Sequence, residues 1–111
     1  ESDITYVRDR KLAQIEAAIQ ASEGTLTPLR TVLARMEKQL DEETKKGDQK
    51  AVKQTANSIK QTKDQIARHE STIAAKKAEQ VAVRKHYDEE LARYRELKRS
   101  SDAGGKAVTR E

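Results

Sequence analysis

Several side-chain types are missing from this chain of 111 residues, which contains no cysteine, no tryptophan and no phenylalanine. Without cysteine, disulfide bonds and thiolate metal sites are excluded. Proline occurs once, and the three tyrosines are the only aromatic residues. A compact globular core needs bulky apolar side chains, and these are scarce here. The composition therefore disfavours a compact globular domain.

Charged residues make up 38% of the chain, while the formal net charge is only +4. Low hydrophobicity with high charge is typical of disordered chains. Here, however, the charges have mixed sign, glycine is rare, and the apolar residues recur at helical spacing. A chain of this kind is expected to form long helices or a coiled coil.

The charges also bear on possible partners. Residues 1–50 carry 9 Lys/Arg and 10 Asp/Glu, and residues 51–111 carry 14 and 9, so the halves have net charges of −1 and +5. The basic residues alternate with acidic ones, which disfavours a nucleic-acid surface. No run approaches the ~18 apolar residues of a membrane span, so we expect none.

Apolar residues in both halves follow a heptad pattern. In the first half they are spaced by three, four or seven residues, with Ser22 in the one gap: Leu12, Ile15, Ile19, Leu26, Leu29, Leu33, Met36 and Leu40. In the second half, apolar and polar residues alternate at the same spacing: Val52, Thr55, Ile59, Thr62, Ile66, His69, Ile73 and Lys76. This spacing predicts a coiled-coil seam. We expect its phase to loosen at Val81 and Val83 and to resume from Tyr87.

The segment Lys45–Lys50, KKGDQK, separates the two patterns. Gly47 can adopt the left-handed conformation that ends a helix, and Asp48 is a good N-cap for the next one. If the chain folds back here, facing residues have numbers that sum to about 95, which pairs large side chains with small or polar ones. The sequence therefore predicts an all-α fold, an antiparallel two-helix coiled-coil hairpin.

The expected arms of this hairpin are residues 3–46 and 49–99. Pro28 lies inside the first arm, where its ring crowds the carbonyl group of Gly24. Because the heptad phase continues from Ile19 to Leu29, we predict one helix that is kinked near Pro28. The alternative is that Thr27 and Pro28 begin a separate helix. Residues 100–111, which include two glycines, are expected to form a flexible C-terminal tail.

Two alanine groups face each other in this register, and they permit a close approach of the arms: Ala17, Ala18, Ala21, Ala74, Ala75 and Ala78. The alternative is that alanine is present only as a good helix former. Across the hairpin, His86 is expected near Asp9, which would favour the charged imidazole. The alternative, which we favour, is that His86 is an ordinary exposed histidine.

No residue pattern indicates a catalytic, cofactor or metal site. The two histidines are too far apart along one helix to share a metal, and the acidic cluster Asp41–Glu43 is explained by ion pairs to Lys45 and Lys46. The candidate interaction residues are instead the tyrosines Tyr6, Tyr87 and Tyr94, which gather at the open end of the hairpin. They either seal the ends of the helices or form a docking surface. Val32 and Val81 lie off the seam and add a partial second stripe.

Two segments, SDITYVRDRKLAQIEAAIQASEGTL and ARHESTIAAKKAEQVAVRKHYDEELARYRELK, resemble the helical C-terminal region of small Gram-negative envelope proteins. In that family a signal peptide and a short β-rich domain of unknown function precede the helices. The resemblance covers Ser2 to Lys98, and RDRKLA and RYRELK are its most specific parts. It implies export to the periplasm and a region that preceded Glu1. The short turn at Gly47 and the proline at position 28 depart from the pattern.

These observations predict a non-enzymatic structural or assembly module of the cell envelope. Its partner is a second copy or another envelope protein, with no small-molecule substrate and no cofactor. The alternative is a cytoplasmic adaptor or chaperone-like hairpin of a secretion or motor apparatus. We do not expect an enzyme, because no set of polar residues converges in a cleft.

Overall fold

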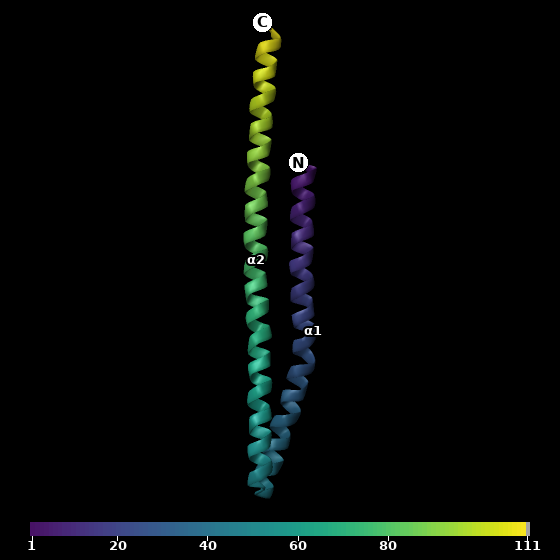
Figure 1. The fold of residues 1–111 in the computed structure, drawn as a ribbon, viewed down its shortest axis with the longest axis vertical. Helices are drawn as coiled ribbons and strands as arrows, with labels where there is room; N and C mark the ends of the chain where they lie inside the picture. The colour runs from purple at the N-terminus through teal and green to yellow at the C-terminus, as the bar shows by residue number, and fades with distance from the viewer. Residues whose placement is uncertain (111) are drawn as a thin grey trace. The chain divides into compact units, whose positions relative to one another are not determined.

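Two long helices make up the fold. The computed structural model describes the backbone of residues 1–110 and the side chains of residues 1–102. Helix α1 spans Ser2–Lys46 and helix α2 spans Gln49–Arg110, and the described residues contain no strand. The two helices pack together and run in opposite directions (Figure 1). The predicted all-α two-helix hairpin is confirmed, and supercoiling of its helices stays a prediction.

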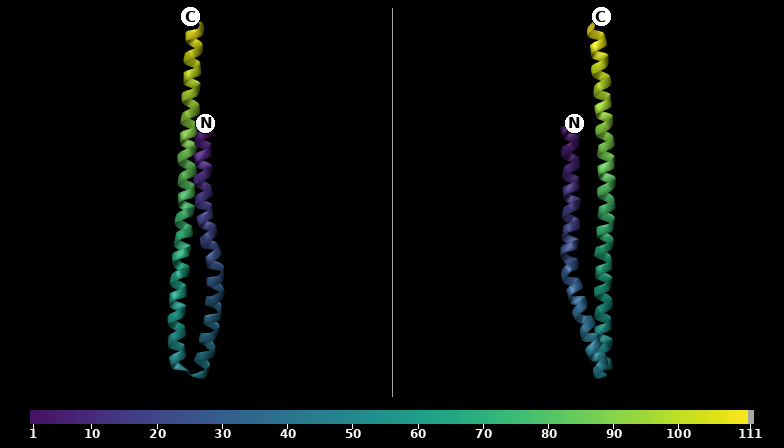
Figure 2. Two further views of the ribbon diagram at one scale, coloured as in Figure 1. Left: turned by 45° about the vertical axis from the view of Figure 1, so that its right-hand side comes forward. Right: turned by 180° about the vertical axis from the view of Figure 1, so that it is seen from behind.

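The turn between the helices has the geometry that its sequence predicts. Gly47 has a φ of 74°, and its N–H donates to the carbonyl of Thr44 at 3.1 Å. The N–H of Asp48 donates to the carbonyl of Glu43 at 3.2 Å, which completes a Schellman motif. The Asp48 carboxylate then accepts the N–H of Ala51 at 3.1 Å and caps α2. The chain reverses direction here (Figure 2).

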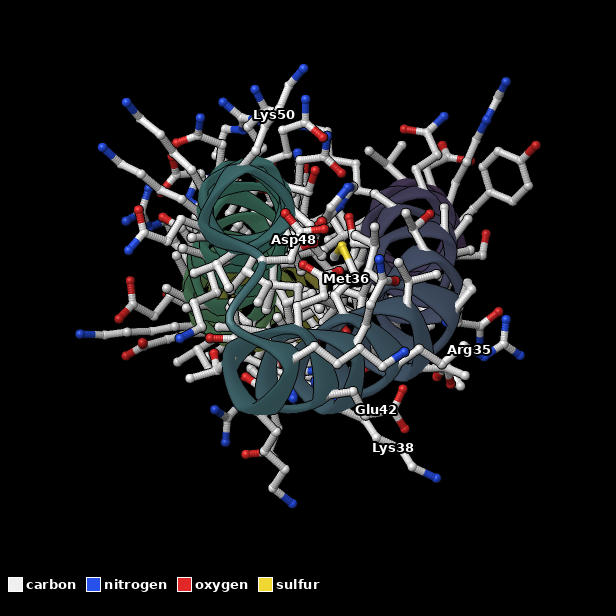
Figure 3. The ribbon with its side chains drawn as sticks, turned by 90° about the horizontal axis from the view of Figure 1, so that it is seen from below. Arg35, Met36, Lys38, Glu42, Asp48 and Lys50 are labelled. Atoms are coloured by element: carbon white, nitrogen blue, oxygen red, sulfur yellow. The ribbon has the colours of Figure 1, made fainter. Side chains whose placement is uncertain are left out.

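The chain comprises two compact units, and the first to be described, unit 2, is Ala17–Lys76. It contains the turn and most of the deeply buried side chains, which are Ile19, Ser22, Leu26, Thr55, Ile59 and Ile66. All of them occupy seam positions of the predicted heptads. Met36 is half-buried and lies between the two helices, whereas Arg35 and Lys38 point outward (Figure 3). One face of each helix therefore supplies the whole core of this unit.

Unit 1 consists of Glu1–Glu16 and Lys77–Glu111. Its buried side chains are Ile15 from α1 with Tyr87 and Leu91 from α2. The prediction that the heptad phase loosens before Tyr87 is wrong. Gln80 and Val83 are half-buried at the expected spacing, and Val81 is exposed. A long polar side chain such as that of Gln80 can occupy a seam position because its end still reaches water.

The alanine residues contribute little to the seam. Of the six that were expected to face one another, only Ala18 is even half-buried, and the other five are exposed. The expected close approach of the helices at these alanines is therefore not found. Alanine serves here as a strong helix former on the solvent side.

Polar contacts between the helices agree with the predicted register. In unit 1 the Gln80 amide donates to Glu16 at 2.7 Å, and Arg8 lies 3.4 Å from Asp88. In unit 2 Arg30 lies 3.1 Å from Glu70. The two pairs in unit 1 fall within about one position of the register derived from the seam, and the third is about one helical turn away, within reach of an arginine side chain.

Helix α2 is longer than the sequence analysis predicted. We expected it to end at residue 99, and it continues to Arg110. No proline follows Arg99, and a glycine in a helix costs only about 1 kcal/mol relative to alanine, so no residue here forces an end. The side chains of residues 103–110 and all of residue 111 lie outside the described residues. The flexibility predicted for residues 100–111 therefore stays a prediction.

Helix α1 is continuous across Pro28. The alternative of a separate helix beginning at Thr27 is therefore not found, while the size of any kink stays a prediction. Pro28 has no N–H to donate to Gly24, and nearby Thr25 and Thr31 hydroxyls each donate to the carbonyl four residues earlier. Back-bonded hydroxyls of this kind are associated with helix bending.

We predict that Gly47→Ala lowers the free energy of unfolding by about 1 kcal/mol, because a non-glycine residue is disfavoured at positive φ. A Cβ atom at Gly47 would meet no other atom within 4 Å, so the cost is one of backbone conformation. Gly24→Ala is the matched control, since its Cβ also meets nothing and its backbone is helical. The control should gain about 1 kcal/mol. Urea unfolding measures both, and equal effects of the two changes would contradict the turn geometry.

We predict that Pro28→Ala raises the free energy of unfolding by about 2 kcal/mol, because alanine restores a helical N–H donor and removes the ring from the preceding turn. Thermal unfolding followed by circular dichroism measures the change. A lower stability in the variant would mean that Pro28 acts as a helix start in solution.

Candidate interaction site

Among the described side chains, six large hydrophobic ones remain exposed: Tyr6, Val7, Val32, Val81, Tyr94 and Leu97. Val32 is 42% exposed and Val81 is 69% exposed, so both predicted stripe residues lie on the surface. Five of the six belong to unit 1, and only Val32 belongs to unit 2. An apolar side chain that the chain's own fold leaves exposed to water can be covered by a partner.

The three tyrosines do not share one environment. Tyr87 is only 9% exposed, whereas Tyr6 is 64% and Tyr94 is 39% exposed. The Tyr87 ring meets His86 edge-on at 4.9 Å, and the Lys11 ammonium lies 5.4 Å from its centroid. Hydrogen bonding to the Tyr87 side chain raises the pKa of Lys11. Tyr87 is therefore a core residue with a cationic neighbour, and the exposed Tyr6 and Tyr94 stay candidates for contact with a partner.

The acidic cluster at the turn is resolved into separate pairs. Asp41 lies 3.1 Å from Lys45, as the sequence predicts. Glu43 instead points toward α2, where the Thr55 hydroxyl lies 2.8 and 2.9 Å from its two carboxylate oxygens. The Gln39 amide donates to the same carboxylate at 2.7 Å. Glu43 therefore joins the two helices near the turn.

Sequence analysis missed this role of Glu43, although a signal was present. Residue 43 follows Leu40 by three positions and thus continues the heptad phase, so a side chain there lies in the seam. The partner, Thr55, is a seam position of α2 and is buried. A carboxylate at a seam position near a polar seam residue predicts a hydrogen bond between them.

At the other end of α1, the carboxylate of Glu1 connects the start of the helix to α2. Its carboxylate accepts from Arg95 Nη2 at 2.6 Å and from Nε at 3.0 Å. This hydrogen bond is the main cause of the lowered pKa of Glu1. Desolvation is the second-largest effect and opposes it, while the charges of Arg95, the N-terminal amine and Lys98 each lower the pKa further. The pKa of Arg95 is raised by the same contact.

His86 is exposed, as one of the two interpretations of the sequence expected, and its Nε2 lies 3.2 Å from Glu90, one turn along its own helix. Asp9 pairs with Arg8 at 3.0 Å, and the nearness of His86 to Asp9 stays a prediction. Both side chains pair with a neighbour on their own helix, because such pairs form whatever the register between the helices.

Unit 2 has shallow surface depressions. One has a volume of about 620 Å³ and lies along one side of α1 at Thr27, Arg30, Thr31, Ala34, Arg35 and Lys38. Another of about 520 Å³ lies at the turn, between Thr44 and Lys53. Both are open to solvent. Within the part of the chain that the structure describes, no group of three or more histidine, aspartate or glutamate residues is placed to hold a metal ion.

No helix among the described residues has both the length and the apolar character needed to cross a membrane. No family model matches the chain, and no curated protein or solved structure is significantly similar to it. The surfaces described above are thus the direct indications of what the chain contacts.

We predict that Arg95→Gln raises the pKa of Glu1 toward its ordinary value, because the variant removes the main group that favours the carboxylate. A carboxyl group with a lowered pKa stabilises the fold above its unfolded pKa, and this contribution disappears as the pH falls through the folded pKa. The variant should therefore be less stable than the parent near neutral pH and equally stable in acid. An NMR titration of the Glu1 carboxyl carbon gives the pKa directly.

Arg93→Gln is the matched control for this titration. It removes the same charge two residues away, and no ion pair in the described residues involves Arg93. The control should leave the pKa of Glu1 nearly unchanged. Equal shifts in both variants would show that the general positive charge of α2, and no specific Glu1–Arg95 contact, acts on the carboxylate.

Proposed function

We propose that this chain is a non-enzymatic structural module that assembles with protein partners through exposed faces of its helices. The observation that carries this proposal is the exposure of valines outside the seam, 42% at Val32 and 69% at Val81. Helix surfaces that stay in water usually carry polar residues, whereas packed helices bury their apolar ones. Apolar side chains on a second face fit a helix that has a further neighbour.

The energetics of a single hairpin support the same proposal. Ordering the backbone costs roughly 1–2 kcal/mol per residue, and apolar burial returns about 25 cal/mol per Å². In α2 the seam positions Thr62, His69 and Lys76 are polar and only half-buried. No described side chain falls below 2% exposure. Two helices alone therefore bury little apolar area for the number of residues that they order.

We propose further that the chain forms a homo-oligomer, most simply two hairpins that build a four-helix bundle over part of their length. Such an assembly covers a second face of each helix without changing the seam. The location that we propose, the periplasm, rests on the resemblance of RDRKLA and RYRELK to Gram-negative envelope proteins. A signal peptide in the full gene would support this location.

We predict that the melting temperature of the chain rises with protein concentration, since association stabilises the folded form by mass action. Changing Val32 and Val81 together to glutamate should lower the melting temperature and remove this dependence. Differential scanning calorimetry over about a hundredfold range of concentration measures both effects.

Ala34→Glu and Asn57→Glu together form the matched control. They add the same charge to the same two helices at positions that are already exposed. The control variant should retain the concentration dependence. A melting temperature that does not depend on concentration in the parent chain would contradict self-association and leave assembly with a different protein.

A further inference from the structure

One stretch of α2 in unit 2 differs from the rest of the unit in its charges. Residues 49–63 contain four lysines and no aspartate or glutamate. Asp48 and Asp64 mark the two ends of this stretch. The part of α1 in the same unit is different, because residues 35–46 contain four Lys/Arg and four Asp/Glu. Charge of a single sign is therefore a property of this stretch of α2 and does not follow from the composition of the chain.

The four lysines share one side of α2, which we call the lysine face. Lys50, Lys53, Lys60 and Lys63 are separated by three, seven and three residues, and residues at such spacings lie on the same side of a helix. All four are exposed, and Lys50 points away from the hairpin on a different side from Arg35 and Lys38 (Figure 3). At 1.5 Å per residue, the row of lysines is about 20 Å long.

The lysine face has no negative charge of its own to balance it. In the described part of the chain, the side chains of these four lysines form no ion pair and no hydrogen bond. Other cations of unit 2 are paired, such as Lys45 with Asp41 and Arg30 with Glu70, both at 3.1 Å. Like charges that are neighbours on a helix surface are destabilising. A negatively charged partner would remove this repulsion.

The side chains among the lysines are small or polar, as Ala56, Asn57 and Gln61 show. The three tyrosines of the chain all lie outside Ala17–Lys76, so unit 2 has no Tyr, Phe or Trp. A partner helix would need bulky apolar side chains to pack against, and a single-stranded nucleic acid would need aromatic rings on which its bases stack. The lysine face supplies neither, so it favours a partner that charge alone can bind.

The shape of the lysine face also favours one kind of polyanion. The lysines form a row along the convex side of a helix, and a flat surface can meet such a row over its whole length. The grooves of a B-DNA duplex are about 12 and 6 Å wide, so a row of this length would cross the phosphate strands at only a few places. The headgroups of anionic lipids, in contrast, form a continuous negative surface.

We propose that the lysine face, formed by Lys50, Lys53, Lys60 and Lys63, binds the surface of a membrane that contains anionic lipids. The ammonium groups lie among the lipid headgroups, and this part of α2 lies along the membrane surface. Lysine suits the task because its flexible side chain carries a point charge that needs no fixed geometry. Each lysine near such a surface strengthens binding about fivefold. This inference goes beyond the proposed function, because its partner is a lipid surface and it uses neither Val32 nor Val81.

The test measures how much of the whole chain sediments with vesicles. The vesicles consist of phosphatidylcholine alone or of equal parts of phosphatidylcholine and phosphatidylglycerol. We expect binding to the mixed vesicles only, and its loss at high salt, because salt screens the attraction. Lys50→Gln with Lys60→Gln should weaken binding by about tenfold or more, whereas Lys50→Arg with Lys60→Arg should retain it. If the parent chain does not bind the mixed vesicles, the proposal is overturned.

Arg35→Gln with Lys38→Gln is the matched control for total charge. It removes the same two charges from exposed positions on another side of the same unit. This control should leave vesicle binding nearly unchanged. Equal weakening by the two pairs of changes would show that only the general positive charge of the chain acts, which would contradict the proposal. Circular dichroism of each variant confirms that the helices remain folded.

A second measurement reports which side of the hairpin meets the membrane. Because the chain has no cysteine, Asn57→Cys in the lysine face and Ala34→Cys on α1 each provide a single site for a fluorescent label. A quencher attached to lipid headgroups should quench the label at position 57 more strongly than the label at position 34. Equal quenching at the two positions would mean that no face is preferred and would overturn the proposal.

Three other occupants of the lysine face are tested in parallel. A DNA duplex or a polyglutamate peptide that binds more tightly than the mixed vesicles, and that Lys50→Gln with Lys60→Gln releases, would assign the face to a nucleic acid or to an acidic protein. If the gene encodes residues before Glu1 or after Glu111, the longer protein is measured as well. Loss of vesicle binding in that protein would assign the face to those residues. Each of these results overturns the proposal.

Discussion

A hairpin of two helices buries only one side of each helix, and the rest of this structure depends on that constraint. The seam has to carry nearly all of the apolar burial, which is why its residues follow the spacing of three and four so closely. Polar residues in the seam then need hydrogen-bond partners, or side chains long enough to reach water. Thr55 finds the Glu43 carboxylate, whereas the long side chain of Gln80 reaches Glu16 at the edge of the seam.

The turn and the seam specify the same register by independent means. The Schellman motif at Gly47 and the cap at Asp48 leave one connecting conformation between the helices. The heptad pattern alone would allow a slip by a whole heptad with little loss of apolar contact. A turn that joins Lys46 to Gln49 over two residues removes that freedom, because no slack remains in the chain. Consistency between local and long-range signals favours one folded state.

Features governed by helical spacing could be predicted from the sequence, and features that depend on side-chain reach could not. The seam positions and the turn at Gly47 follow from periodicity and from the conformational freedom of glycine. The partners of His86 and Glu43 depend on which of several nearby groups a flexible side chain meets, and spacing does not determine that choice. The end of α2 was also missed, because no proline after Arg99 forces the helix to stop. The phase was expected to loosen at Val81 and Val83, whereas Val83 is half-buried at the regular seam spacing and only Val81 of the two is exposed.

The two units divide the burial and the exposure of apolar side chains unequally. Unit 2 contains four of the seven buried hydrophobic residues in the described part of the chain, together with the turn, and only Val32 among its large hydrophobic residues is exposed. The described residues of unit 1 include the other three buried hydrophobic residues and five exposed ones. In unit 2 the two helices bury nearly all of the large apolar side chains near the turn, and this packing helps to fix the register of the helices. The exposed apolar side chains described in unit 1 are the ones that the proposed assembly would cover. The residues that specify the hairpin therefore lie mostly in unit 2, whereas most of the exposed hydrophobic residues described here lie in unit 1.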